Sequence, residues 1–118
     1  MDTYEVLAEA IRTRKRVVAR YHGEERVFSP HALGTKRGTY HVLVYQFAGG
    51  SRSGLPPGGE WRCLNLDELG DLRLESGPWH TAENVFNQQT CLDDVEVVAE
   101  PLPPRQLADA QADERTFP

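Results

Sequence analysis

The sequence predicts a mainly β, α+β fold, in which an N-terminal helix is followed by a small five-stranded antiparallel β-barrel. Apolar residues recur at a spacing of three and four near the N-terminus, and beyond Arg16 this spacing changes to alternation. No long segment of helical periodicity separates the strands, so no crossover helix is present to join parallel pairs. The 118 residues suffice for a single domain, which we expect to span residues 1–99.

The N-terminal segment has the features of an amphipathic helix. Its apolar side chains share one face: Tyr4, Leu7, Ala8 and Ile11. Asp2 precedes them, and Glu5 three residues later completes a capping box. The basic residues among positions 12–16 lie at the expected C-terminus, where the helix dipole favours positive charge.

Five segments are predicted to be strands because they alternate or are rich in β-branched residues between turn residues. They cover residues 16–21, 26–28, 39–47, 61–66 and 71–75. Strand 39–47 is expected to be central because both of its faces are apolar. Residues 95–98 are expected to add an edge strand, and residues 81–89 one or two helical turns. The proline-rich residues 100–118 are expected to form a disordered tail.

The charge of the chain is unevenly distributed. The formal net charge is −5, yet the first forty residues hold eight basic residues against five acidic ones. A uniform basic coat for duplex DNA is therefore excluded, whereas a local anion-binding surface in the first third is compatible with the sequence.

The chain has no apolar stretch long enough to cross a bilayer and no signal-like N-terminus. We therefore expect a cytoplasmic protein without membrane contact, in which Cys63 and Cys91 are reduced thiols. The histidines and cysteines lack metal-ligand spacing, and no catalytic or phosphate-loop motif is present. The sequence thus predicts no metal, no cofactor and no enzyme activity.

Four blocks resemble the WYL domain family in their order and spacing. They comprise residues 7–21, 26–33, 38–45 and 62–69, and Tyr40-His41-Val42 stands where the family has its Trp-Tyr-Leu triplet. The resemblance covers about residues 5–75. It implies an Sm-like, SH3-type β-barrel of bacterial regulators that sense ligands, mainly nucleic acids or nucleotides, and that govern transcription or anti-phage enzymes.

Five residues form the predicted ligand site: Tyr21, Arg26, His41, Tyr45 and Arg62. The resemblance places Arg26 and Arg62 at the family's arginine positions, and guanidinium groups pair well with phosphate. The three rings would flank the anion and offer faces to a base. The alternative is that the arginines are solvated strand residues and the rings are core or rim aromatics.

The sequence therefore predicts a non-catalytic regulatory module that binds a single-stranded nucleic acid or nucleotide. Ligand binding would change its association with a larger regulatory protein or with a second copy of the chain. The alternative is an SH3-like protein-interaction module without a nucleic-acid ligand, which the acidic balance after residue 40 favours.

Overall fold

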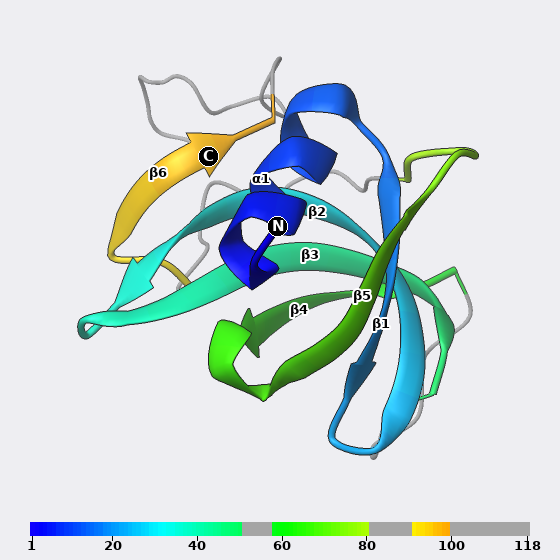
Figure 1. Ribbon diagram of the computed structural model, residues 1–118, viewed down its shortest axis with the longest axis horizontal. Helices are drawn as coiled ribbons and strands as arrows, with labels where there is room; N and C mark the ends of the chain where they lie inside the picture. Colours follow the sequence, from blue (N-terminus) through cyan, green and yellow to red (C-terminus); the bar gives the residue numbers. More distant parts are fainter. Residues whose placement is uncertain (51–57, 81–90, 100–118) are drawn as a thin grey trace.

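The computed structural model describes residues 1–50, 58–80 and 91–99. This part of the chain contains one α-helix, one short 3-10 helix and six strands, and their arrangement can be followed in Figure 1. The elements are α1 (Thr3–Thr13), β1 (Arg16–Tyr21), β2 (Glu24–Lys36), β3 (Thr39–Gly49), β4 (Glu60–Asn65), the 3-10 helix η1 (Leu66–Glu68), β5 (Leu69–Glu75) and β6 (Asp94–Val98). The predicted helical turns at 81–89 and the predicted disordered tail lie outside the described residues.

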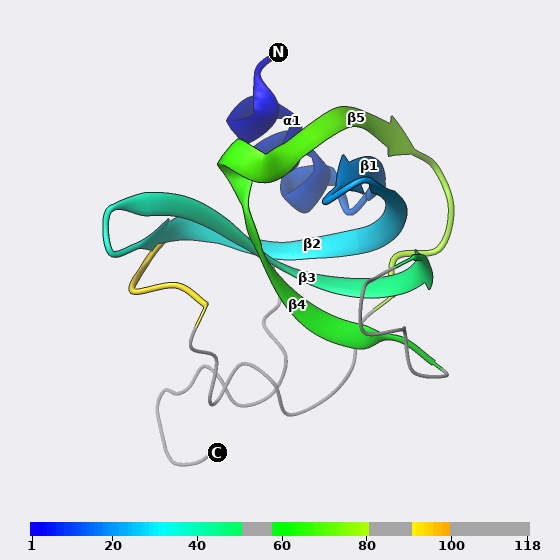
Figure 2. The same ribbon diagram turned by 90° about the horizontal axis from the view of Figure 1, so that it is seen from below.

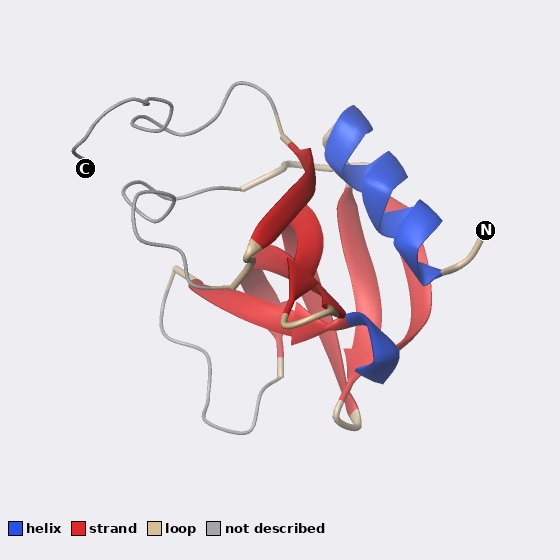
Figure 3. Cartoon of the chain, turned by 90° about the vertical axis from the view of Figure 1, so that its left-hand side faces the viewer, coloured by secondary structure: helices blue, strands red, loops and turns tan. Residues whose placement is uncertain are grey.

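Helix α1 begins and ends as its sequence predicts. The Asp2 carboxylate accepts a hydrogen bond from the backbone N–H of Glu5 at 2.8 Å, and the Glu5 carboxylate accepts one from the backbone N–H of Asp2 at 3.0 Å. Arg14 ends the helix in the left-handed region, with φ of 55°. The buried face packs on the sheet beside β2 and β5 (Figure 3) and consists of Leu7, Ala8, Ala10 and Ile11.

The strands form one antiparallel sheet in the order β4-β3-β2-β1-β5, and β6 pairs with β2. Figure 2 shows how strongly this sheet bends. A mainly β fold with an N-terminal helix is therefore confirmed. As predicted, β3 is an interior strand, with β4 on one side and β2 on the other. The predicted barrel does not close, because β4 and β5 at the two ends of the path form no ladder with each other within the described residues. The short helix η1 joins them instead.

Strand β2 is far longer than predicted, since it continues through Pro30 to Lys36. Residues 24–28 pair with β1, residues 32–35 pair with β6, and β3 pairs with β2 along nearly its whole length. Pro30 lies between the β1 and β6 pairings, where a residue without a backbone N–H costs no ladder hydrogen bond on that side. One bent strand thus serves both halves of the sheet.

The two faces of the sheet carry separate cores. We call the face toward α1 the inner face; its core includes Val17, Phe28, Val44 and Leu64. On the opposite, outer face, Ala32 and Leu43 pack with Cys91 and Leu92. Alternation along β3 separates the faces, because successive side chains of a strand point to opposite sides.

The structure corrects the prediction of reduced thiols, because Cys63 and Cys91 form a disulfide with their Cα atoms 5.4 Å apart. Their separation of 28 residues matches no sequence motif, and only the packing of the chain before β6 against β4 brings them together. Cys63 is exposed on β4. None of the described helices has the length and apolar character needed to span a bilayer.

Candidate functional site

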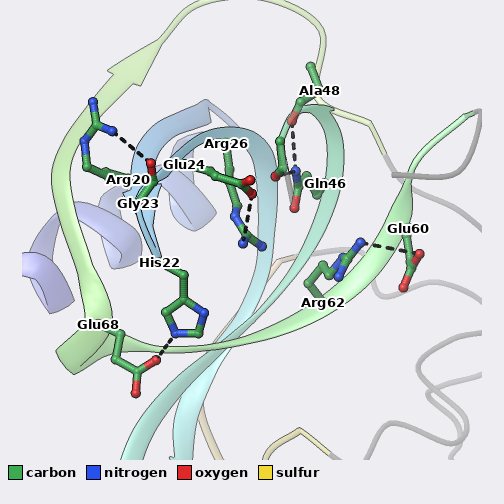
Figure 4. A network of polar contacts seen from close by, with 11 residues as sticks. Arg20, His22, Gly23, Glu24, Arg26, Gln46, Ala48, Glu60, Arg62 and Glu68 are labelled. Atoms are coloured by element: carbon green, nitrogen blue, oxygen red, sulfur yellow. Dashed lines mark hydrogen bonds and ion pairs between the residues drawn. The ribbon is translucent and has the colours of Figure 1, made fainter. Parts of the chain in front are cut away.

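The candidate site lies on the inner face, where β2, β3 and β4 each contribute a polar side chain (Figure 4). Arg26 alternates with Phe28 on β2, Gln46 with Val44 on β3, and Arg62 with Leu64 on β4. The apolar members of these pairs belong to the main core. The three polar residues therefore lie on the same face as the main core, beside its apolar side chains. We call Arg26, Gln46 and Arg62 the inner polar cluster.

Arg26 is a buried cation whose positive charge is only weakly balanced by a nearby carboxylate. Only 4% of the residue is exposed, and its guanidinium lies 4.9 Å from the centre of the Tyr21 ring. Its Nη2 is 3.7 Å from Glu24 Oε1, and its Nε has no hydrogen-bond partner in the described part of the chain. Burial lowers the pKa of the guanidinium, and the positive charge of Arg62 lowers it further, against the opposing effect of Glu24. The cluster thus holds two cations close enough to repel each other.

Arg62 is the more accessible of the two cations. Its side chain is 17% exposed, and Nη2 lies 3.6 Å from Glu60 Oε1. Each arginine therefore faces a carboxylate two residues away on its own strand, at a distance beyond the 2.7–2.9 Å typical of a charge-assisted hydrogen bond. Because both ion pairs are this long, another anion can take the place of either protein carboxylate.

Gln46 lies on the strand between the two arginine strands and is fully buried. Its Nε2 donates to the carbonyl oxygens of Ala48 and Gly50, while Oε1 has no hydrogen-bond partner among the residues described. Buried polar atoms without partners are rare and are often functional. Gln46 was not among the predicted site residues, although a polar residue on a strand as apolar as β3 was a usable signal.

Tyr21 and the turn after β1 border the inner polar cluster. The Tyr21 hydroxyl accepts a hydrogen bond from the backbone N–H of Asn65 at 3.2 Å, and burial raises the Tyr21 pKa. The His22 ring stacks on Tyr21 with centroids 4.1 Å apart, and its Nε2 contacts the Glu68 carboxylate. That hydrogen bond lowers the pKa of Glu68. The contact between His22 and Glu68 was not predicted from the sequence, because 46 residues separate them.

The structure brings together three of the five predicted site residues: Tyr21, Arg26 and Arg62. His41 and Tyr45 fall on the outer face, because they alternate with the core residues of β3. The Tyr45 hydroxyl donates to the Gly58 carbonyl, and its ring contacts Trp61 edge-on with centroids 5.2 Å apart. His41 Nδ1 lies 2.9 Å from the Thr39 carbonyl oxygen. These two rings are therefore not part of the candidate site.

The described residues include no group of three or more His, Cys, Asp or Glu side chains placed to hold a metal ion. What the inner polar cluster can do chemically is bind an anion. Its donors are guanidinium groups, and its closest negative charges are the loosely held carboxylates of Glu24 and Glu60.

Fold and site together define a small antiparallel β domain with one N-terminal helix and a cationic cluster on its inner face. The family model of the WYL domain matches residues 2–74, which is more than half of the chain. The chain therefore belongs to the WYL domain family, a family of regulatory, ligand-sensing domains. The resemblance seen over about residues 5–75 is thus confirmed. Comparison with curated proteins and with solved structures gave no match.

Proposed function

We propose that this WYL domain senses a nucleic acid or nucleotide, one phosphate of which binds between Arg62 and Arg26. The observation that carries the proposal is that β2 and β4, with only β3 between them, place two arginines on the inner face, where the charge of Arg62 lowers the Arg26 pKa. A phosphate between them would take the place of the Glu24 and Glu60 carboxylates, which lie 3.7 and 3.6 Å from the arginines. Arginine forks also match the geometry of phosphate oxygens.

Ligand entry begins at Arg62, because its side chain is more exposed than that of Arg26. The phosphate displaces the Glu60 carboxylate there and then the Glu24 carboxylate from Arg26. The Glu24 side chain is 39% exposed, so it has room to move toward solvent. The Glu24 and Glu60 carboxylates are 39% and 44% exposed, so each can turn toward water while the phosphate replaces its negative charge beside the arginine.

The nucleobase is recognised next to the phosphate by His22. The Tyr21 ring already contacts Arg26 and His22, whereas the His22 side chain is 40% exposed and offers a flat surface. Bases of single strands stack on such rings with little sequence preference. We therefore assign the stacking role to His22, with Tyr21 as the ring that holds both Arg26 and His22 in place.

The domain itself performs no catalysis in this proposal. Ligand binding alters the turn after β1 and the start of β4, and these changes modulate a larger regulatory protein that acts on transcription or on nucleic acid in the cytoplasm. Self-association of the domain is the alternative output of the same event.

The test is a fluorescence-anisotropy titration of the chain with a labelled short single-stranded oligonucleotide over a series of salt concentrations. Arg62→Ala should weaken binding about tenfold or more, as expected for loss of a hydrogen bond between charged groups. The slope of log affinity against log salt should fall by about 0.7 for one lost phosphate contact. Arg20→Ala is the matched control, because Arg20 is a 56% exposed arginine on the outer face, paired with Asp71.

Equal losses in the Arg62 and Arg20 variants would mean that general charge, not the inner polar cluster, attracts the oligonucleotide. Absence of binding to oligonucleotides and to mononucleotides alike would refute the proposed ligand class. A far-ultraviolet circular dichroism spectrum of each variant checks that the sheet is intact.

A second candidate function, binding of a protein partner, is favoured by a groove at the start of α1. Its volume is about 520 Å³, and it is lined by Asp2, Tyr4, Glu5, Tyr40 and Glu96. Tyr40 is 44% exposed and meets Tyr4 edge-on. Aromatic rings among carboxylates suit a basic segment of a protein and repel phosphate. If this groove is the functional site, Tyr40→Ala will weaken binding of an arginine-rich peptide and leave oligonucleotide binding unchanged.

A further inference from the structure

We propose that Cys63 and Cys91 are a thiol-exchange site, at which a low-molecular-weight thiol of the glutathione type opens the disulfide. Opening releases Cys91 and Leu92, which cover apolar residues on the outer face of the sheet. The inference is independent of the proposed ligand. It rests on the unequal burial of the two cysteines and on the packing of Cys91 and Leu92 against the sheet, which the disulfide holds in place.

The two cysteines differ strongly in accessibility. Cys63 lies on β4 and is exposed, whereas only 4% of Cys91 is exposed. Within the described residues, β4 pairs with β3 alone and is an end strand of the sheet, so a thiol can approach Cys63 from solvent. Exposed disulfides are the reducible ones, since exchange needs access of a thiolate to a sulfur atom. The incoming thiolate therefore attacks Cys63.

The disulfide holds a small apolar cover on the sheet. Cys91 and Leu92 pack on Ala32 and Leu43, with Trp61 beside them. The chain is anchored separately from Asp93 onward, because the Asp93 backbone N–H donates to the Thr35 carbonyl at 2.8 Å and β6 then pairs with β2. Opening the disulfide thus loosens Cys91 and Leu92 and leaves β6 in place.

The exchange proceeds in two balanced steps. The thiolate attacks Cys63 Sγ, so a mixed disulfide forms there, the bond between the two Sγ atoms breaks, and Cys91 leaves as a thiolate that takes a proton from water. A second thiolate attacks the small-molecule sulfur of the mixed disulfide and releases Cys63. Two small thiols are oxidised to one small disulfide, and the protein disulfide is reduced to two thiols. The reverse reaction with the small disulfide restores the bond.

The reduced pair is positioned to re-form. Cys63 Sγ lies 3.6 Å from the Cys91 carbonyl oxygen, which can accept a hydrogen bond from the Cys63 thiol once the disulfide is open. The β6 anchor two residues beyond Leu92 keeps Cys91 close to β4. Short tethering of this kind favours closure over the alternative of two independent mixed disulfides.

The experiment equilibrates the full chain in buffers with different ratios of reduced to oxidised glutathione. Free thiols are then blocked by alkylation and counted by mass spectrometry. We expect both thiols to appear together as the buffer becomes reducing. Hydrogen exchange should rise in peptides that contain Leu43 and Leu92 and stay unchanged in β6. A disulfide that persists in excess reduced glutathione, or reduction without a change at Leu43 and Leu92, would overturn the proposal.

Two single variants test which sulfur is attacked. With Cys91→Ser, the exposed Cys63 should form a mixed disulfide with oxidised glutathione about tenfold faster than Cys91 does in the matched Cys63→Ser variant. Equal rates, or faster reaction at Cys91, would show that the burial difference does not direct the exchange. The wild-type measurement above needs no substitution, so failure of a variant to fold would not obscure the result.

Discussion

Acidification should destabilise this protein through His31, a fully buried residue of β2. The ring stacks on Trp79 with centroids 4.1 Å apart and meets Trp61 edge-on at 4.6 Å. Its Nδ1–H donates to the Ser29 carbonyl at 2.8 Å. Burial lowers the His31 pKa from 6.5 to about 4, although the Ser29 hydrogen bond opposes the shift. The imidazole is therefore neutral in the folded protein at every pH well above 4.

The sign and size of the effect follow from this difference. Below pH 6.5 the unfolded chain takes up a proton on His31 that the folded protein does not, so the free energy of unfolding falls as the pH falls. The loss ends near the folded-state pKa of about 4. It amounts to about 3 kcal/mol in total, of which about 2 kcal/mol is lost between pH 7 and pH 5.

The measurement is urea unfolding of the oxidised protein at pH 7, 6 and 5, compared with His31→Phe. The substitution keeps an aromatic ring between the two tryptophans and removes the titrating group. Other titrating groups are common to both proteins, so the difference between their pH dependences isolates His31. The free energy of unfolding of the wild type should fall about 2 kcal/mol more than that of the variant. Parallel pH dependences would refute the inferred burial of a neutral imidazole.

Three further substitutions test other parts of the structure. Glu24→Gln removes the carboxylate beside Arg26 and should raise oligonucleotide affinity in the anisotropy assay, whereas Glu25→Gln, which removes a partner of Arg73 on the outer face, should have a smaller effect. Gly34→Ala would place a Cβ 1.9 Å from the Asp94 carbonyl oxygen, so β6 must shift and urea unfolding should show a loss of about 1–3 kcal/mol. Asp2→Ala removes the capping box of α1 and should cost about 1 kcal/mol in the same assay. An unchanged stability in either of the last two variants would contradict the packing or the cap described above.

Local features were readable from the sequence because their causes lie within a few residues. The capping pair Asp2 and Glu5 and the apolar spacing that follows them define α1 without any reference to the sheet. The apolar character of both faces of residues 39–47 likewise predicted a strand with neighbours on both sides, and β3 lies between β2 and β4.

Other predictions failed where the decisive contact lies far away in the chain. A strand was predicted over residues 26–28 alone, yet β2 continues to Lys36 because β1 pairs with it before Pro30 and β6 pairs with it after Pro30. The disulfide was not predicted because 28 residues separate Cys63 from Cys91. The predicted barrel does not close because β4 and β5, the two end strands of the sheet, do not pair with each other in the part of the chain that the structure describes.

The candidate site shows the same division. Alternation in the sequence sorts the residues of β3 into two sets, with His41 and Tyr45 in one and Gln46 in the other. It does not say which set faces α1, because a strand has the same period of two whichever side is buried. Packing of the helix against one face made that choice in the tertiary structure. The sequence alone thus determined the helix, the strand-forming segments and the family, while only the bent sheet decided that Arg26, Gln46 and Arg62 share a side.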